Sequence, residues 1–217
     1  MIKMALFGCG RIGRLHAQNI CHNQGAELVQ VYDVHQLSAD QLATRHNCEV
    51  ALSVEVILAN SDIDAVLIGT STDTHADLIE ASAKAGKAIF CEKPIDLSLD
   101  RVKQCAATIA PYNVPVQIGF NRRFDPSHKS AKNAVVTGQI GDLQQVILTS
   151  RDPEMPPQSY MKTSGGMFCD MTIHDFDLAR FLLGEEPTEI FAYASALVNP
   201  KACAAVGDID SAMIQMK

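Results

Sequence analysis

Three side chains in the second half of the chain could move a proton, and their spacing suggests that they act together. The stretch FCDMTIHDFDLARFLLG, residues 168–184, carries Asp170, His174 and Asp177 among apolar residues and ends at a glycine. The apolar period predicts one amphipathic helix over 168–183. Residues four apart share a helix face, so Asp170 can accept from one ring nitrogen of His174 and leave the other for a substrate. A histidine oriented in this way can accept a proton near neutral pH.

A lysine at the end of a strand pattern is the second candidate for chemistry. In AIFCEKPIDLS, Glu92 and Lys93 follow an apolar run that ends at Cys91, and Pro94 fixes the turn. An ammonium there could donate a hydrogen bond to a substrate hydroxyl and stabilise its ionised form. The plainer alternatives are that Glu92 and Lys93 are solvated surface charges, and that His174 is a core histidine with ordinary partners.

A glycine-rich turn near the N-terminus predicts a dinucleotide site. LFGCGRIGRLHAQN carries Gly8, Gly10 and Gly13 in the spacing G-x-G-x-x-G, after an apolar strand and at the start of a helix. Gly8 permits a tight turn, Gly10 lets the backbone approach a pyrophosphate, and Gly13 lets the helix pack on the strand. The first helical residues, Arg11 and Ile12, bring free N–H groups to the phosphates.

An acidic residue supports the same interpretation and bears on the type of cofactor. Asp33 lies 20 residues beyond Gly13, where the second strand pattern ends. A carboxylate there accepts from the adenosine ribose hydroxyls and repels a 2′-phosphate, so the sequence favours NAD over NADP. The alternative is a tight turn followed by a surface aspartate.

A polar loop follows the third strong strand pattern, which ends at Ile68. Ligands lie outside the carboxyl ends of parallel strands, so we expect Thr70, Ser71 and Thr72 to lie near the cofactor. His75 comes next, where a helix begins. It either touches the cofactor or is solvated, and the sequence does not choose between these.

The elements that would position these residues alternate in the first half of the chain. Strand patterns cover 2–7, 26–32, 65–68, 87–90 and 114–118, and helix patterns end near His22, cover 36–46, stop at Gly86 and cover 98–109. This alternation predicts an α/β fold, a parallel sheet with helices on both faces. We therefore expect an NAD-binding Rossmann domain at 1–119.

The pattern changes after residue 119. A helix pattern with a glycine exit, a strand pattern at 142–152, a proline-rich loop, the helix at 168–183 and two strand patterns at 189–198 and 208–217 follow one another. This order predicts a partial α+β domain at 120–217, in which two helices accompany an open antiparallel sheet of three strands. Because an open sheet leaves an unpaired edge, we expect a homo-oligomer.

Composition excludes several functional classes. The net charge of −7 over 217 residues argues against a nucleic-acid face and against a polybasic membrane patch. The start MIKMALFG lacks the features of a signal peptide, and no apolar run approaches the length of a membrane span. The seven cysteines are scattered without zinc spacing, so we expect reduced thiols, no metal and a cytoplasmic location.

Several stretches taken together resemble the Gfo/Idh/MocA oxidoreductase family, and its inositol dehydrogenases in particular. They are GCGRIGRLHAQNI, GTSTDTHADLI, CEKPIDLS, QIGFNRRFDP, SRDPEMPP and GGMFCDMTIHDFDLARFLLGEEP. The Glu-Lys-Pro turn followed by the Asp-x-x-x-His helix is the most specific part. The resemblance covers essentially the whole chain in order and implies a Rossmann domain followed by an α/β domain with a large open, mostly antiparallel sheet. Residues 120–217 would then be part of a domain that serves substrate binding and oligomerisation. Because members of this family are longer, we expect the chain to be a fragment or a shortened gene product.

The resemblance also implies an activity. Lys93, Asp170 and His174 match the family's catalytic residues, which implies NAD-dependent oxidation of a cyclic polyol, myo-inositol to its 2-keto form. Glu92 and Lys93 are expected beside the cofactor. Candidates for contacts to the other hydroxyls are Arg122, Asp152, Tyr160 and Asp177, whereas Arg123 is either a further contact or a surface charge. Two alternatives stay open, a dehydrogenase of another polyol or sugar and a non-catalytic member that binds a nucleotide or a sugar.

Overall fold

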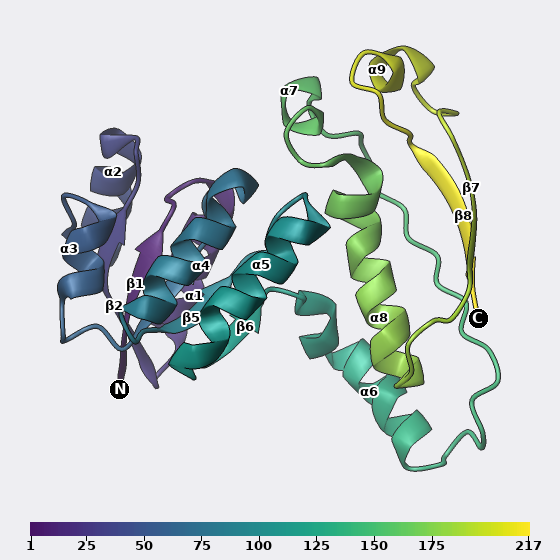
Figure 1. The fold of residues 1–217 in the computed structure, drawn as a ribbon, viewed down its shortest axis with the longest axis horizontal. Helices are drawn as coiled ribbons and strands as arrows, with labels where there is room; N and C mark the ends of the chain where they lie inside the picture. The colour runs from purple at the N-terminus through teal and green to yellow at the C-terminus, as the bar shows by residue number, and fades with distance from the viewer. The chain divides into compact units, whose positions relative to one another are not determined.

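The computed structural model describes residues 1–217, which form two compact units, Met1–Gly119 and Phe120–Lys217 (Figure 1). The first unit is a six-stranded sheet with the order β3-β2-β1-β4-β5-β6, and every pair of neighbours is parallel. Its strands are β1 (Ile2–Phe7), β2 (Ala26–Tyr32), β3 (Glu49–Val50), β4 (Ala65–Ile68), β5 (Ala88–Cys91) and β6 (Val116–Ile118). The α/β fold class with a parallel sheet is therefore confirmed.

Helices cover both faces of this sheet. They are α1 (Arg11–His22), α2 (Gln36–His46), α3 (Val54–Ala59), η1 (Thr72–Thr74), α4 (His75–Lys84), α5 (Leu99–Ile109) and η2 (Ala110–Tyr112). Side chains alternate along a strand, so the neighbours Leu6 and Phe7 enter different cores. Leu6 packs with residues of α1 and α2, and Phe7 packs with residues of α3, α4 and α5. Burying a side chain of this size stabilises the fold by roughly 1.5–3 kcal/mol.

The strand order places the ligand-binding edge of the sheet. Strands run outward on both sides from β1, so the order reverses between β1 and β4. In such sheets the ligand crevice lies outside the carboxyl ends of the strands at this point. Gly8 follows β1 and Gly69 follows β4, and both therefore lie at this edge.

The second unit combines helices with a two-stranded antiparallel sheet. Its elements are η3 (Asn121–Phe124), α6 (Pro126–Val136), α7 (Gln158–Met161), η4 (Phe168–Thr172), α8 (Ile173–Leu183), β7 (Ile190–Ser195), α9 (Pro200–Ala204) and β8 (Ser211–Met216). Asp125 caps α6 by accepting from the N–H groups of Ser127 and His128, with Pro126 at the first helical position. Gly184, with φ +79°, ends α8.

Two predictions about this unit need correction. The stretch 142–152, predicted as a strand, forms no strand, because none of its backbone groups joins a ladder with β7 or β8. The helix predicted over 168–183 is not α-helical throughout, because η4 is a π-helical turn that precedes α8. None of the helices in either unit is long and apolar enough to cross a bilayer.

Candidate active site

The glycine turn between β1 and α1 is closely packed at two positions and open at the third. Gly8 has φ +93°, and a Cβ there would lie 2.6 Å from the carbonyl oxygen of Gly69. A Cβ at Gly13 would overlap the carbonyl oxygen of Gly8, whereas one at Gly10 would meet nothing within 4 Å. Gly8 and Gly13 are therefore required by the fold itself, and Gly10 leaves the backbone accessible from outside.

The start of α1 suits a bound anion. Gly10 is its N-cap residue, no side chain caps the first turn, and the first turn carries no acidic residue. Free N–H groups at a helix start carry a partial positive charge. The open approach at Gly10 and the uncapped helix start thus fit the phosphates of a dinucleotide. Arg11 is exposed and Ile12 is half-buried at this position.

Asp33 is tied to the glycine turn. Its Oδ2 accepts the N–H of Cys9 at 2.6 Å, and its Oδ1 accepts the N–H of His35 at 2.8 Å. Each carboxylate oxygen can accept a further hydrogen bond, so contact with a ribose stays a prediction compatible with this geometry. Burial, together with the charge of Asp33, raises the pKa of the Cys9 thiol to about 12. Cys9 therefore stays protonated and is no nucleophile.

The loop after β4 is connected to the turn after β5 by a buried histidine. His75 is 1% exposed, with Nδ1 2.8 Å from the carbonyl oxygen of Pro94 and Nε2 3.1 Å from that of Thr70. This placement favours a structural tie between two loops over the cofactor contact that the sequence left open. The Thr70 hydroxyl bonds that of Thr74 at 2.7 Å, and Ser71 and Thr72 lie where η1 begins.

Glu92 has a partner that the sequence analysis missed. His16 Nε2 lies 2.6 Å from Glu92 Oε1, and the His16 ring packs edge-on against Phe90 at 5.3 Å. Burial alone would raise the pKa of Glu92, but the hydrogen bond and charge of His16, with the N–H and ammonium of Lys93, hold it below its ordinary value. Helical period was the available signal, because His16 shares a face of α1 with the buried Gly13 and Ala17.

Lys93 directly follows Glu92 and is joined to Pro94 by a cis peptide bond. The N–H of Glu92 donates to the carbonyl oxygen of Ile68 at 2.9 Å, which fixes this turn beside the end of β4. The ionised Glu92 and the carbonyl of Pro94 are both bonded to histidines, so the backbone on either side of Lys93 is held.

In the second unit, Asp170 lies within the π-helical turn η4. Tyr160, from α7, donates its hydroxyl to Asp170 Oδ1 at 2.9 Å. Tyr160 was predicted to contact substrate, and the structure brings it to a predicted catalytic carboxylate. His174 is the second residue of α8 and is half-buried. Isolated π-helical turns are rare and occur frequently at functional sites.

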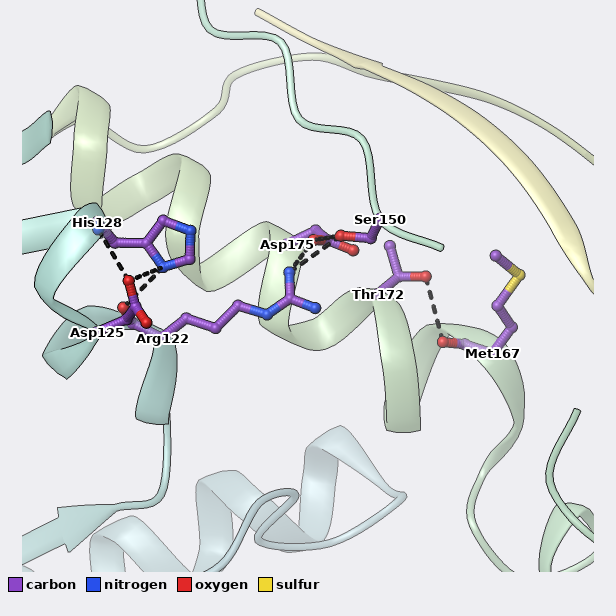
Figure 2. A network of polar contacts seen from close by, with 7 residues as sticks. All are labelled: Arg122, Asp125, His128, Ser150, Met167, Thr172 and Asp175. Atoms are coloured by element: carbon purple, nitrogen blue, oxygen red, sulfur yellow. Dashed lines mark hydrogen bonds and ion pairs between the residues drawn. The ribbon is translucent and has the colours of Figure 1, made fainter. Parts of the chain in front are cut away.

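The two arginines after residue 120 have different partners. Arg122 donates to Ser150 Oγ at 3.1 Å and to the carboxylate of Asp175, which also accepts from Ser150 (Figure 2). Figure 2 also shows Asp125 beside His128, near the start of α6. Asp175 was missed from the sequence because its partners lie 53 and 25 residues away.

Asp177 was predicted to hold a substrate hydroxyl, and the structure gives it an ion-pair partner. Arg123 donates from Nε at 2.7 Å and from Nη2 at 2.6 Å, so both carboxylate oxygens are engaged. Asp177 is 4% exposed. This bidentate pair favours a structural role for Asp177. Asp152, another predicted substrate contact, lies exposed in an irregular stretch.

Comparison with known proteins covers both units. Residues 2–120 match the Gfo/Idh/MocA profile described as an oxidoreductase family with an NAD-binding Rossmann fold, and residues 128–217 match the Gfo/Idh/MocA C-terminal domain. An inositol 2-dehydrogenase of Rhizobium meliloti is 50% identical over 98% of this chain and 64% of its own length. The chain thus spans just under two thirds of this relative.

Solved structures agree with this match. A myo-inositol dehydrogenase of Corynebacterium glutamicum superposes with a TM-score of 0.94 at 39% identity, over 100% of this chain and 65% of that one. A scyllo-inositol dehydrogenase of Lactobacillus casei, solved with NAD(H) and scyllo-inositol, has a TM-score of 0.83 at 30% identity, over 100% and 64%. This chain therefore belongs to the Gfo/Idh/MocA family of oxidoreductases with an NAD-binding Rossmann fold.

Proposed function

We propose that this chain oxidises a secondary alcohol of a cyclic polyol with NAD, and that myo-inositol is converted to its 2-keto form. The match of both units to relatives named as inositol dehydrogenases carries the proposal. Lys93, Asp170 and His174 are all present; the backbone on both sides of Lys93 is hydrogen-bonded, Asp170 accepts from Tyr160, and His174 lies half-buried in α8. Because the chain spans about 64% of the first relative's length, its activity is a proposal.

The open glycine turn and the uncapped start of α1 would hold the diphosphate of NAD, with Asp33 at the ribose. NAD, when bound, supplies a hydride acceptor for the alcohol carbon. The chain's own side chains handle the proton and the oxygen. His174 accepts the hydroxyl proton, and Lys93 donates a hydrogen bond to the same oxygen and stabilises its developing charge.

Asp170 orients His174 and stabilises the imidazolium that forms. The hydrogen bond from Tyr160 to Asp170 Oδ1 supports this role because it limits the rotation of the carboxylate. Arg122, Asp152 and Tyr160 stay candidates for the other hydroxyls of the ring. The ion pair with Arg123 makes Asp177 the weakest of the four candidates.

Two features support the choice of cofactor and assembly. The carboxylate of Asp33 is held at the end of β2, where it would repel a 2′-phosphate, so we expect NAD to bind more tightly than NADP. The outward apolar side chains of β7 and β8, which include Phe191, Tyr193 and Met213, support the expected homo-oligomer. Sedimentation of the chain would measure its assembly.

A specific observation favours a second candidate substrate. A relative of Bacillus subtilis, 39% identical, is named scyllo-inositol 2-dehydrogenase (NAD(+)). The two cyclitols differ in the direction of one hydroxyl, which a few side chains can distinguish. scyllo-Inositol is therefore the alternative substrate, and a non-catalytic binding protein is the alternative from another class.

The test follows NADH absorbance with myo-inositol, scyllo-inositol and glucose. We expect Lys93→Ala and His174→Ala to abolish turnover while calorimetry shows nearly unchanged NAD affinity. Asp33→Ala should weaken the affinity for NAD by roughly tenfold, a loss of about 1.4 kcal/mol of binding free energy. The same substitution should reduce the preference for NAD over NADP. Full activity of His174→Ala would refute the role of His174 as the proton acceptor. NAD binding without turnover of any polyol would support the alternative of a non-catalytic binding protein.

A further inference from the structure

The peptide groups of Met167, at the entrance to the π-helical turn, are held by two side chains. Asp208 Oδ1 accepts the N–H of Met167 at 3.1 Å. Thr172 Oγ1 donates to the carbonyl oxygen of Met167 at 3.2 Å, the contact drawn at the right of Figure 2. Thr172 is 7% exposed, so its hydroxyl has little access to water. Met167 is thus fixed on both its N–H and its C=O side.

The residue before Met167 is adapted to this contact. Gly166 has φ +75°, and a Cβ there would lie 2.7 Å from Asp208 Oδ1 and 3.0 Å from its Cγ. Only glycine adopts this conformation readily and leaves room for the carboxylate. Asp208 itself is anchored, because its N–H donates to the carbonyl oxygen of Cys203 at 3.0 Å.

The spacing of the Thr172 contact matches a π turn. An α-helical turn closes on the residue four positions back, and a π turn closes on the residue five positions back. Met167 lies five positions before Thr172. In the α register, the carbonyl that faces Thr172 would be that of Phe168. The hydroxyl of Thr172 therefore stabilises the π register against the α register.

The register of this turn decides where Asp170 points, because Asp170 is the central residue of η4. A change to the α register would turn its side chain about the helix axis and away from the Tyr160 hydroxyl. We propose that Thr172 and Asp208 are positioning residues, which hold the π turn and so aim the Asp170 carboxylate. The catalytic consequence rests on the proposed function, whereas the effect on the Tyr160 contact does not.

Matched variants separate this role from general stability. Thr172→Val removes the hydroxyl at nearly constant shape, and Thr172→Ser returns it. Asp208→Ala removes the acceptor, and Asp208→Asn keeps an oxygen that can accept from Met167. Thr137→Val is the control, because the Thr137 hydroxyl donates to a backbone carbonyl in the same unit, that of Asn133 at 2.7 Å.

The first measurement is steady-state turnover of the full chain with the polyol it oxidises. We expect Thr172→Val and Asp208→Ala to lower kcat by roughly 10- to 100-fold, because a catalytic group is misaimed, and to leave the KM for NAD unchanged. Thr172→Ser and Asp208→Asn should recover most of the lost kcat. Thr137→Val should match the wild type.

The second measurement does not need activity. The ring signals of Tyr160 in a ¹³C-tyrosine-labelled chain, assigned with Tyr160→Phe, report its hydrogen bond to Asp170. In Thr172→Val and Asp208→Ala they should move toward their positions in Asp170→Ala. If the wild type oxidises no polyol, the proposed function fails and these signals still decide the inference.

Either of two results would overturn the inference. One is Tyr160 signals that stay at wild-type positions in both Thr172→Val and Asp208→Ala. The other is a loss of kcat in Thr172→Ser and Asp208→Asn as large as that in Thr172→Val and Asp208→Ala. General destabilisation would then explain the loss of kcat. If Asp208→Ala does not fold, Thr172→Val and Thr172→Ser decide alone.

Discussion

The ion pair between Arg123 and Asp177 should be strongly asymmetric in its effect on stability. The Asp177 side chain is 5% exposed and that of Arg123 is 37% exposed, although two hydrogen bonds join them. Removing Arg123 leaves a buried carboxylate without its cation, whereas removing Asp177 leaves a guanidinium that water can reach. The hydrogen bonds that Asp177 accepts from Arg123 also raise the pKa of Arg123.

The magnitudes follow from this difference in burial. We expect Arg123→Met to lower the free energy of unfolding by roughly 3–5 kcal/mol, the usual cost of an uncompensated buried charge. Asp177→Asn should cost about 1–2 kcal/mol, because it keeps one acceptor and the exposed guanidinium can be rehydrated. Methionine at position 123 retains contact with the Phe181 ring, which lies 5.4 Å from the Arg123 guanidinium carbon.

Urea unfolding followed by circular dichroism measures these changes, and amide exchange of α8 assigns them to the second unit, because two units can unfold separately. Arg180 and Glu186 provide the matched control. Their ion pair has the same bidentate geometry, with Arg180 donating from Nε and Nη2 to both oxygens of Glu186, and the side chains are 45% and 71% exposed. Arg180→Met should have little effect. Equal losses in Arg123→Met and Asp177→Asn, or a loss in Arg180→Met as large as that in Arg123→Met, would refute the reasoning.

Two further predictions concern the first unit. The pKa of Glu92 is lowered, so the stability that its ionised form contributes is present above the ordinary 4.5 and is lost as the pH falls through the lowered pKa. His16→Leu should therefore lower the free energy of unfolding by about 1–3 kcal/mol at pH 7 and make this free energy depend less on pH below 4.5. Urea titrations at several pH values measure both effects, and a pH dependence below 4.5 equal to that of the wild type would contradict the prediction. Gly10→Ala should keep the thermal midpoint, because φ is −71° and the new Cβ meets nothing, but should weaken NAD binding in calorimetry. Gly13→Ala should instead lower the midpoint, because its Cβ overlaps the Gly8 carbonyl, and the reverse ranking would contradict the assigned roles.

The first unit could be predicted well because its signals are local. Strands buried on both faces are short apolar runs, and three of them were placed with their observed bounds, Ile2–Phe7, Ala26–Tyr32 and Ala65–Ile68. The structure adds β3 and α3, which are two and six residues long. Elements of this length do not show a period that the sequence can reveal.

The second unit was harder because strand pairing is non-local. The stretch 142–152 has the composition of a strand and forms none, whereas β7 and β8 pair along six residues each. Composition shows which residues suit a strand and does not show what they pair with. Side-chain partners were missed for the same reason. His16 meets Glu92 across 76 residues, and Asp208 meets Met167 across 41.

The segment formed by η4 and α8 changes its helical register between Asp170 and Asp177. The four-residue rule assumes an α-helical register, which the structure supports from Ile173 onward and replaces with a π register across Asp170. Within the α-helical part, Asp177 is buried and forms a bidentate ion pair with Arg123, which fixes α8 to η3. Asp170 lies in the turn where the register differs. Because the α-helical part is fixed, the direction of the Asp170 side chain depends on Thr172 and Asp208, which hold this turn. Substitutions of these two residues should therefore lower kcat more than they lower the free energy of unfolding.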